Sequence, residues 1–386
     1  MNIKEKDRLY IANTYARFPL VLKSGKGSLV TDEDGKEYID LATGIAVNTF
    51  GYCDSEWVKA VTEQLNTLQH TSNLYYTSPC AELAEIICQK TNMKKVFFSN
   101  SGAEANECAI KVARKYATEK KGAEYSTIIT LKNSFHGRTI TTLAATGQDV
   151  FHKDFLPLTD GFRYVAANNC EELIKTVENG KIAAIMFETV QGEGGVLPLQ
   201  EDFVKTIFEL AEKYDILTIA DEVQTGNGRT GKLYGFMNYG VTPDIFSTAK
   251  GIGGGLPLGA TAMGEKVKDV LIPSSHGSTF GGNPVACAGA LSIINRIDDA
   301  LLEEVKCKSE YIINTLKNAK GVKSVSGKGL MLGIETEKEA GVIIAECMKN
   351  GVLVIKAKNK VRLLPALNIP FELLEKAINI LVKACE

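Results

Sequence analysis

Short apolar runs alternate with helical patterns along the chain from about residue 93 to residue 260. Five of these runs predict strands without the alternation of a half-exposed strand: Lys95–Phe98, Thr127–Leu131, Ile182–Phe187, Ile216–Ala220 and Ile245–Thr248. Because such runs are rich in Ile, Val and Phe, we expect helices to cover both of their faces. The pattern therefore predicts an α/β fold around a mainly parallel sheet.

Two helical patterns connect these strands. In Glu201–Tyr214 apolar side chains recur at i, i+4, i+7, i+8 and i+11, which predicts an amphipathic crossover helix. Ser101–Ala117 carries a similar stripe and opens with Ser-Gly-Ala-Glu, a capping-box pattern. A second helix is therefore expected to begin directly after the first strand.

The two ends of the chain differ in pattern from the middle. In Thr31–Ile39, Asp34-Gly35 favours a hairpin turn, while Leu302–Leu316 has a helical pattern and Val352–Ile355 that of a short strand. We predict a large domain at residues 49–281. A smaller α+β domain is expected to combine residues 1–48 with residues 282–386.

Composition and charge argue against some classes of binding partner and some cellular locations. Of the 386 residues, 45% are hydrophobic and 23% charged, as in ordinary globular proteins. With 44 basic against 46 acidic residues the formal charge is -2, which provides no positive field for nucleic acid. The start, MNIKEKDRLY, lacks the apolar core of a signal peptide, and no run reaches the roughly 18 apolar residues of a membrane span. We expect a cytoplasmic protein.

The cysteines and histidines do not predict a metal centre. Nine cysteines occur without a Cys-x-x-Cys pair, and none of the four histidines are paired at helical spacing. Reduced, mostly buried thiols are the expected state.

Polar and glycine-rich segments follow each of the five predicted strands. Ligands of open α/β sheets bind beyond the carboxyl ends of the strands, so we predict one site built from five loops. In chain order these loops are Ser99–Gly102, Asn133–Arg138, Glu188–Gly195, Asp221–Gly226 and Ala249–Gly251.

Three features in these loops have a functional and a structural interpretation. The helix start at Ser101 offers free N–H groups to an anion such as phosphate, although a plain capped helix is the commoner case. Asp221 after a buried strand could face a protonated heterocyclic nitrogen or simply cap a turn. Lys250 could be a desolvated Schiff-base lysine, whereas most lysines are solvated.

Two further motif matches are interpreted as coincidences. Gly226–Gly231 matches the dinucleotide fingerprint, but no good helix follows it. The same stretch begins like a phosphate-binding P-loop, yet Leu233 stands where that loop needs Ser or Thr for magnesium.

These segments resemble the class III aminotransferases, a family of fold-type I pyridoxal-phosphate enzymes, and within it the acetylornithine aminotransferase group. The resemblance spans nearly the whole chain and rests on FFSNSGAEANECAIKVARKY (97–116), SFHGRT (134–139), QGEGGV (191–196), DEVQTGNGRTGKL (221–233), PDIFSTAKGIGGGLPLGA (243–260), HGSTFGGNP (276–284) and VRLLPAL (361–367). It implies a seven-stranded, mainly parallel sheet in the large domain, flanked by helices. It also implies pyridoxal 5'-phosphate as cofactor.

The resemblance implies a role for each cofactor-binding residue. Lys250 would form the Schiff base and, once released by substrate, carry the proton between substrate and cofactor. Asp221 would keep the pyridine nitrogen protonated, so that the ring withdraws electrons. The further ligands implied are Phe135 and Val223 on the ring faces, Gln224 at the phenolic oxygen, Ser101, Gly102 and Ala103 at the phosphate, and Thr279 from a neighbouring subunit. A site shared in this way implies a homodimer.

Substrate recognition is implied in the same way. Glutamate carries two carboxylates, for which planar, bidentate arginines are suited. Arg362 would bind the α-carboxylate and Arg138 the distal one, while Glu193 would neutralise Arg362 when the amine donor has no carboxylate there. The resemblance also implies Ser278 and Tyr15 as substrate-binding residues.

The resemblance implies transfer of the terminal amino group of N2-acetylornithine to 2-oxoglutarate, a step of arginine biosynthesis. Within the same fold the donor could instead be ornithine, succinylornithine, succinyldiaminopimelate or 4-aminobutyrate. An NAD-dependent oxidoreductase would use Gly226–Gly231 with Asp244 at the ribose. A non-catalytic binder would have lost Asp221 or Lys250, and both are present.

The chain departs from the family pattern at two places. Relatives usually have Gly-His-x-His-Pro where this chain has Gly51–Ser55, and proline where it has Thr189. Both departures concern loops near the expected site.

Overall fold

A seven-stranded sheet forms the centre of the computed structural model, which describes residues 1–386. Its spatial order is β4 (Lys95–Ser99), β12 (Gly259–Met263), β11 (Ile245–Thr248), β10 (Leu217–Asp221), β7 (Ile182–Phe187), β5 (Thr127–Leu131) and β6 (Phe162–Val165). β12 runs antiparallel to β4 and β11, and the other neighbours are parallel. The α/β class and the mainly parallel seven-stranded sheet are confirmed.

The five predicted strands correspond to β4, β5, β7, β10 and β11, with β10 beginning one residue later than expected. Two strands, β6 and β12, were not predicted. β12 has the sequence GATAM, whose small residues give no apolar run. Thr261 faces α5 (Gly102–Lys121) and donates a hydrogen bond to Ala105 O at 2.7 Å, while Ala260 and Ala262 are fully buried in the core on the opposite face of the sheet. That packing is tertiary and leaves no trace in the local pattern.

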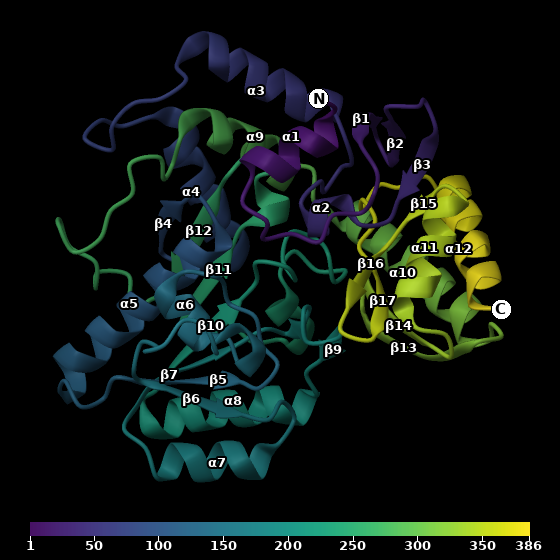
Figure 1. Cartoon of the computed structure of the whole chain (residues 1–386). Coiled ribbons are helices and arrows are strands. Elements are labelled where there is room, and N and C mark those ends of the chain that lie inside the picture. Colours follow the sequence, from purple (N-terminus) through teal and green to yellow (C-terminus); the bar gives the residue numbers. More distant parts are fainter.

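Helices cover both faces of the sheet, and each face has its own core. α5 crosses one face, where its alanines and valine pack on Ala184, Met186 and Leu217. On the other face α8 (Glu201–Tyr214) has the predicted stripe and packs with α7 (Cys170–Glu178) over Ile185 and Phe187. Figure 1 shows α7 and α8 together along one side of the sheet and α5 at another.

Both ends of the chain contribute to a second region. The strands β1 (Leu22–Lys26), β2 (Leu29–Asp32) and β3 (Glu37–Asp40) form a sheet with β15 (Val352–Leu353), so distant segments of the sequence pair. β2 and β3 form the hairpin expected around Asp34-Gly35. Figure 1 shows these purple strands beside the yellow C-terminal helices.

A second four-stranded sheet lies in the C-terminal part. Its order is β13 (Val322–Lys328), β14 (Met331–Thr336), β17 (Lys360–Leu363) and β16 (Ile355–Ala357). The accompanying helices are α10 (Asp299–Lys317), α11 (Ala340–Lys349) and α12 (Phe371–Cys385). The domain boundaries at 48 and 281 stay predictions.

The remaining elements complete the molecule. The longer helices are α3 (Ser55–Thr67), α4 (Ser78–Thr91) and α9 (Pro284–Ile294), with α9 contacting both others. The shorter elements are α1 (Ile3–Tyr10), α2 (Thr43–Ala46), α6 (Ile140–Ala145), β8 (Val190–Gln191), β9 (Leu197–Pro198), and the 3₁₀ turns η1 (Asp149–Phe151), η2 (Gly235–Tyr239) and η3 (Lys250–Ile252). No helix has the length and apolar character needed to cross a membrane.

Candidate active site

The loops after the central strands meet around one cavity of about 460 Å³. Each of the five loops predicted from the sequence contributes to its wall. The predicted residues that line it are Ser101, Gly102, Ala103, Phe135, Arg138, Asp221, Val223, Gln224 and Lys250. A larger surface cavity of about 840 Å³ beside α8 contains none of them.

The N-terminus of α5 opens into this cavity with its backbone N–H groups. Ser101 Oγ accepts a hydrogen bond from Glu104 N at 3.2 Å, and Glu104 accepts one from Asn100 N at 2.5 Å. The N–H groups of Gly102 and Ala103 have no partner within the helix because they lie in its first turn. A Cβ on Gly102 would lie 2.6 Å from Val223 Cγ1, so only glycine permits this close packing. The 20-residue helix can therefore bind an anion at this end.

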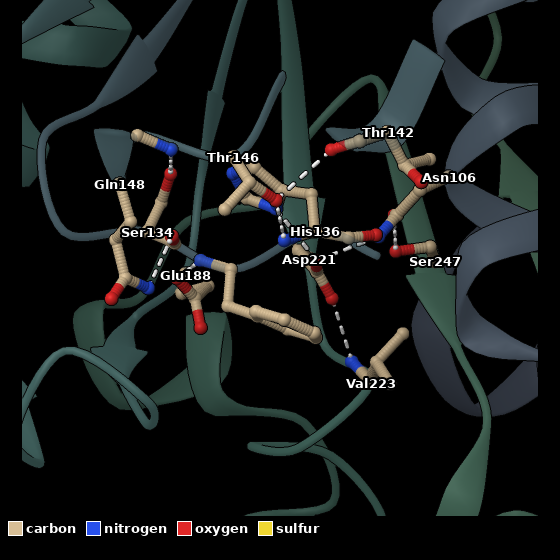
Figure 2. Close-up of polar contacts among 12 residues, drawn as sticks. Asn106, Ser134, His136, Thr142, Thr146, Gln148, Glu188, Asp221, Val223 and Ser247 are labelled. Atoms are coloured by element: carbon tan, nitrogen blue, oxygen red, sulfur yellow. Dashed lines mark hydrogen bonds and ion pairs between the residues drawn. The ribbon is translucent and has the colours of Figure 1, made fainter. Parts of the chain in front are cut away.

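Asp221 stands at the end of β10 and is held from two sides. Its Oδ2 accepts hydrogen bonds from His136 Nδ1 at 2.7 Å and from Asn106 Nδ2 at 2.8 Å. Val223 N donates to Oδ1 at 3.0 Å. Ser247 donates in turn to Asn106 Oδ1 at 2.6 Å, which fixes the amide orientation. Figure 2 shows these side chains converging on the carboxylate.

Buried charge around Asp221 shifts the protonation of its neighbours. Burial disfavours the imidazolium of His136, but the hydrogen bond and charge of Asp221, together with the charge of Glu188, outweigh burial, and the pKa of His136 is raised. Glu188 lies nearby and accepts a hydrogen bond from Phe135 N at 3.0 Å. Burial, partly offset by His136, raises the pKa of Glu188 to about 8. The Asp221 side chain, held in place by His136, is the acidic group that can face a cation in the cavity.

Lys250 follows β11 by two residues and begins η3, rather than ending the strand itself. Its φ of 49° lies in the left-handed region, which is strained for a residue with a side chain. Burial lowers the pKa of the Lys250 ammonium, although Glu193 and Asp221 act against this shift. A larger share of neutral amine makes Lys250 a better nucleophile toward a carbonyl group.

Arg362 on β17 lies behind the cavity wall. Its Nη1 donates to Glu193 Oε1 at 2.6 Å and to Gln224 Oε1 at 3.1 Å, and Gln224 lines the cavity. Burial acts to raise the pKa of Glu193, but the charge and hydrogen bond of Arg362, together with Lys250 and Gln224, outweigh it, and the pKa is lowered. Arg362 Nε is buried without a partner. This leaves donor capacity for another carboxylate.

Arg138 lies at the cavity rim and is exposed. Its guanidinium stacks over the ring of Phe151 with 3.9 Å to the ring centroid, and Phe135 lies 5.4 Å away. The aromatic pair limits where the guanidinium can move, while its N–H groups stay free for an incoming anion.

Besides Arg362 and its partner Glu193, three predicted residues do not line this cavity. Tyr15 is exposed and lines a separate apolar cavity of about 380 Å³. Thr279 is exposed. Ser278 accepts a hydrogen bond from Asn100 Nδ2 at 3.1 Å, which places it next to the loop before α5. Within one chain, therefore, Tyr15 and Thr279 do not line the cavity, and Ser278 contacts its wall through Asn100.

Three buried residues of the site were not predicted from the sequence: Asn106, His136 and Glu188. Each lies inside or directly beside a segment that carries a predicted ligand, such as His136 next to Phe135. Their roles depend on side-chain contacts between distant segments. Proximity in sequence to a ligand is the signal that could have found them.

At the first departure from the family pattern the side chains have local partners, whereas the side chain at the second has none. Tyr52 donates a hydrogen bond to Asp40 Oδ2 at 2.8 Å. Asp54 caps α3 through Trp57 N at 3.0 Å and pairs with Arg296 at 2.7 Å. Thr189 Oγ1 is buried without a partner. None of these side chains lines the cavity of the candidate site.

Together these groups fit pyridoxal 5'-phosphate. The helix N-terminus matches its phosphate, the Asp221 carboxylate matches a protonated ring nitrogen, and the Lys250 amine can condense with its aldehyde. The fold and the site thus define a fold-type I, pyridoxal-phosphate-dependent enzyme. The chain belongs to the class III aminotransferase family, which matches residues 10–385.

Similar proteins cover the whole chain. It is 48% identical over 383 residues to an acetylornithine aminotransferase of Haemophilus ducreyi, with 99% of this chain and 98% of that protein covered. An acetylornithine aminotransferase of Methanocaldococcus jannaschii is 43% identical, with 97% and 96% covered.

Solved structures agree with the fold. The crystal structure of the ornithine aminotransferase of Toxoplasma gondii has a TM-score of 0.95 at 30% identity, with 99% of this chain and 94% of that chain covered. The N-acetylornithine aminotransferase of Stenotrophomonas maltophilia has a TM-score of 0.85 at 35% identity, with 96% of each chain covered.

Proposed function

We propose that this aminotransferase moves the terminal amino group of N2-acetylornithine to 2-oxoglutarate, giving N-acetylglutamate 5-semialdehyde and glutamate. The observation that carries the proposal is the set of relatives named acetylornithine aminotransferase, which match nearly the full length of this chain at 40% to 48% identity. Such a reaction would serve arginine biosynthesis.

In this proposal the cofactor is held by residues that line the cavity. Gly102 and Ala103 N–H groups with Ser101 hold the phosphate, and Asp221 faces the ring nitrogen. Phe135 and Val223 enclose the ring, and Gln224 binds its phenolic oxygen. When bound, the cofactor supplies an electron sink that stabilises negative charge on the substrate carbon.

Lys250 is the catalytic residue of the proposal. Its amine anchors the cofactor in the resting enzyme and afterwards moves a proton at the reacting carbon of the substrate. The lowered pKa of Lys250, caused by burial, favours the neutral amine that both tasks require. His136 and Asn106 act through Asp221, whose carboxylate they orient.

The two arginines would select the dicarboxylate. Arg362 binds the α-carboxylate of glutamate with the donors that Glu193 does not occupy, and Arg138 binds the distal one. With N2-acetylornithine, Glu193 stays paired with Arg362 because the reacting end of that donor carries no carboxylate. The distance of 2.6 Å between Arg362 Nη1 and Glu193 Oε1 supports this change of partner at Arg362.

The assembly belongs to the same proposal. We propose a homodimer in which Thr279 reaches the cofactor phosphate of the partner, since Thr279 is exposed in its own chain, and Ser278 contributes to substrate binding. Tyr15, which is exposed in its own chain, would bind substrate. The nine unpaired cysteines support a reducing, cytoplasmic location.

Initial rates with different donors test the substrate. With 2-oxoglutarate held constant, we expect kcat/KM to be greatest for N2-acetylornithine among the amines ornithine, succinylornithine, succinyldiaminopimelate and 4-aminobutyrate. Ornithine is the second candidate because of the close structural likeness to the Toxoplasma gondii ornithine aminotransferase. A clear preference for any of these four would overturn the substrate assignment and leave the aminotransferase class intact.

A further inference from the structure

Residues 226–231, called here the glycine loop, connect two parts of the site that lie far apart in the sequence. The loop begins two residues after Gln224 and bonds to the end of β11 and the segment after it on one side and to the ends of β14 and β17 on the other. Gly228 has a φ of 85°, and a Cβ there would lie 2.7 Å from Leu367. A Cβ on Gly329 would lie 2.5 Å from Arg229 O. These close approaches fix the loop against the C-terminal sheet.

On one side the loop holds the backbone that precedes Lys250. Asn227 Nδ2 donates to Thr248 Oγ1 at 3.2 Å and to Ala249 O at 3.3 Å. Asn227 is buried, so these bonds are protected from water. Its Cβ is also in the path of any side chain larger than glycine at Gly251. The loop therefore fixes the chain on both sides of Lys250.

On the other side the loop holds the strands that carry Arg362. Arg229 Nη1 donates to Leu330 O at 3.1 Å and to Pro365 O, and Leu330 N donates to Arg229 O at 2.9 Å. Leu330 precedes β14, and Pro365 follows β17. One guanidinium nitrogen thus joins the ends of two strands.

The register explains why an arginine is needed there. β14 and β17 pair Leu332 with Leu363 and Gly333 with Arg362, so the same register brings Leu330 opposite Pro365. Proline has no N–H, and the ladder cannot continue at this pair. Arg229 supplies the missing donors to both carbonyls. These contacts of Arg229 mark the end of the pairing between β14 and β17, three residues beyond Arg362.

Arg229 is buried and has no carboxylate partner, since both of its acceptors are neutral carbonyls. Desolvation lowers the pKa of Arg229 to about 9. A buried, unpaired cation costs stability compared with an apolar side chain of similar volume. Its presence therefore indicates a positional role.

We propose that Arg229 is a positioning residue that sets Arg362 relative to Lys250, and thereby the fit of the glutamate and 2-oxoglutarate α-carboxylate. The inference rests on the proposed function for the part played by Arg362. In the donor half-reaction Arg362 is paired with Glu193 and binds no substrate carboxylate, so Arg229 affects the two half-reactions unequally. A merely structural role would affect both alike.

The test compares single half-reactions of the cofactor-loaded enzyme by stopped-flow absorbance. For Arg229→Met we expect the apparent dissociation constant of glutamate to rise about tenfold or more, the effect of losing hydrogen bonds from a charged donor. The half-reaction with N2-acetylornithine should stay within about twofold of wild type. Arg229→Lys, which keeps a cationic donor on a shorter side chain, should recover part of the glutamate loss.

Arg114→Met is the control because Arg114 is half-buried and, like Arg229, donates to a backbone carbonyl, here Asp160 O, outside the cavity. It should change neither half-reaction. Equal losses in both half-reactions, or an unchanged glutamate constant in a folded Arg229→Met, would overturn the inference. If Arg229→Met does not fold, the same comparison is made with Arg229→Lys, where a glutamate-selective loss supports the inference and an equal loss refutes it.

Failure of the proposed function has a different sign: the wild-type enzyme itself would not react with N2-acetylornithine. The comparison then uses whichever amine donor the wild-type enzyme accepts.

Discussion

At the residue scale, the site depends on buried charged groups whose protonation the fold controls. Asp221 is paired with His136, and the carboxylates of Glu188 and Glu222 are enclosed nearby. Glu222 shows how such a group can be accommodated. Its oxygens accept hydrogen bonds from Gly235 N at 2.6 Å, Phe236 N at 2.9 Å and Thr225 Oγ1 at 2.8 Å.

Glu222 makes the stability of the fold dependent on pH. Burial raises the pKa of Glu222 to about 7 in the folded state, against about 4.3 in an unfolded chain. Between these values the folded state binds the proton that the unfolded state has lost, so stability falls as pH rises. Relative to Glu222→Gln, the free energy of unfolding should fall by up to about 1.4 kcal/mol per pH unit from about pH 4.5 to about pH 7. Urea unfolding of the wild type and of Glu222→Gln across this pH range measures the difference in stability. A difference that does not change with pH would contradict the prediction.

At the element scale, strand ends and one helix start bring the reactive groups together. The N-terminus of α5 sits against the loop after β10 because Gly102 lets Val223 approach it. The phosphate site and the ring site therefore share one contact. How closely Gly102 and Val223 approach each other therefore sets the distance between the two sites, and with it how well one ligand can occupy both.

Gly102→Ala should weaken cofactor binding more than it weakens the fold. The added methyl group would push α5 away from Val223, with which it would clash at 2.6 Å. We expect the dissociation constant for pyridoxal phosphate to rise about tenfold, the usual order for overpacking by one methyl group. Titration of cofactor-free protein measures this. Gly341→Ala, on α11 with open space around it, is the control, and equal affinities of all three proteins would refute the argument.

The sequence predicted those elements whose signal is local. β7 is a continuous apolar run and α8 a clear stripe, and both were predicted with the observed bounds. The turn at α2 could not be predicted, because Thr43, Ile45 and Ala46 all have positive φ there. Such residues avoid this region, and the turn exists because Asp40 accepts hydrogen bonds from Ala42 N at 2.7 Å and Thr43 N at 2.9 Å.

The difference between local sequence signals and contacts between distant segments also holds for the site. Asp221 and Lys250 follow apolar strands, so position and residue type together indicated chemistry. The roles of Thr279, Arg138 and Arg362 came from the resemblance to a family. The contacts of Arg362 with Glu193 and Gln224 join residues more than a hundred positions apart, which no local pattern encodes.

At the scale of the whole molecule, both ends of the chain complete one region, and the proposed dimer completes the site. β3 pairs with β15, and Leu364 N donates to Leu41 O at 2.7 Å next to the strand of Arg362. Main-chain hydrogen bonds therefore join the N-terminal segment to the C-terminal region that carries Arg362. The exposed Thr279 is the one predicted cofactor ligand that its own cavity lacks.

Mixed dimers test whether Thr279 acts across subunits. Lys250→Ala and Thr279→Ala subunits are each expected to have little activity at limiting cofactor. Their heterodimer would contain one site with both wild-type residues, so random mixing should restore about a quarter of wild-type activity in a two-fold symmetric dimer. Activity after dissociation and reassociation of the mixture is the measurement. If the mixture never exceeds the separate variants, Thr279 does not serve the partner.

The central claim is that the Lys250 amine performs the transamination, and replacing it tests this most directly. In Lys250→Ala, pyridoxal phosphate can still bind through the phosphate and ring contacts, but proton transfer at the substrate carbon loses its base. We predict that kcat with N2-acetylornithine and 2-oxoglutarate falls by about 10²- to 10⁴-fold, while the protein stays folded and binds the cofactor non-covalently. Turnover within about twofold of wild type, well outside the 10²-fold expected for loss of a general base, would contradict the account.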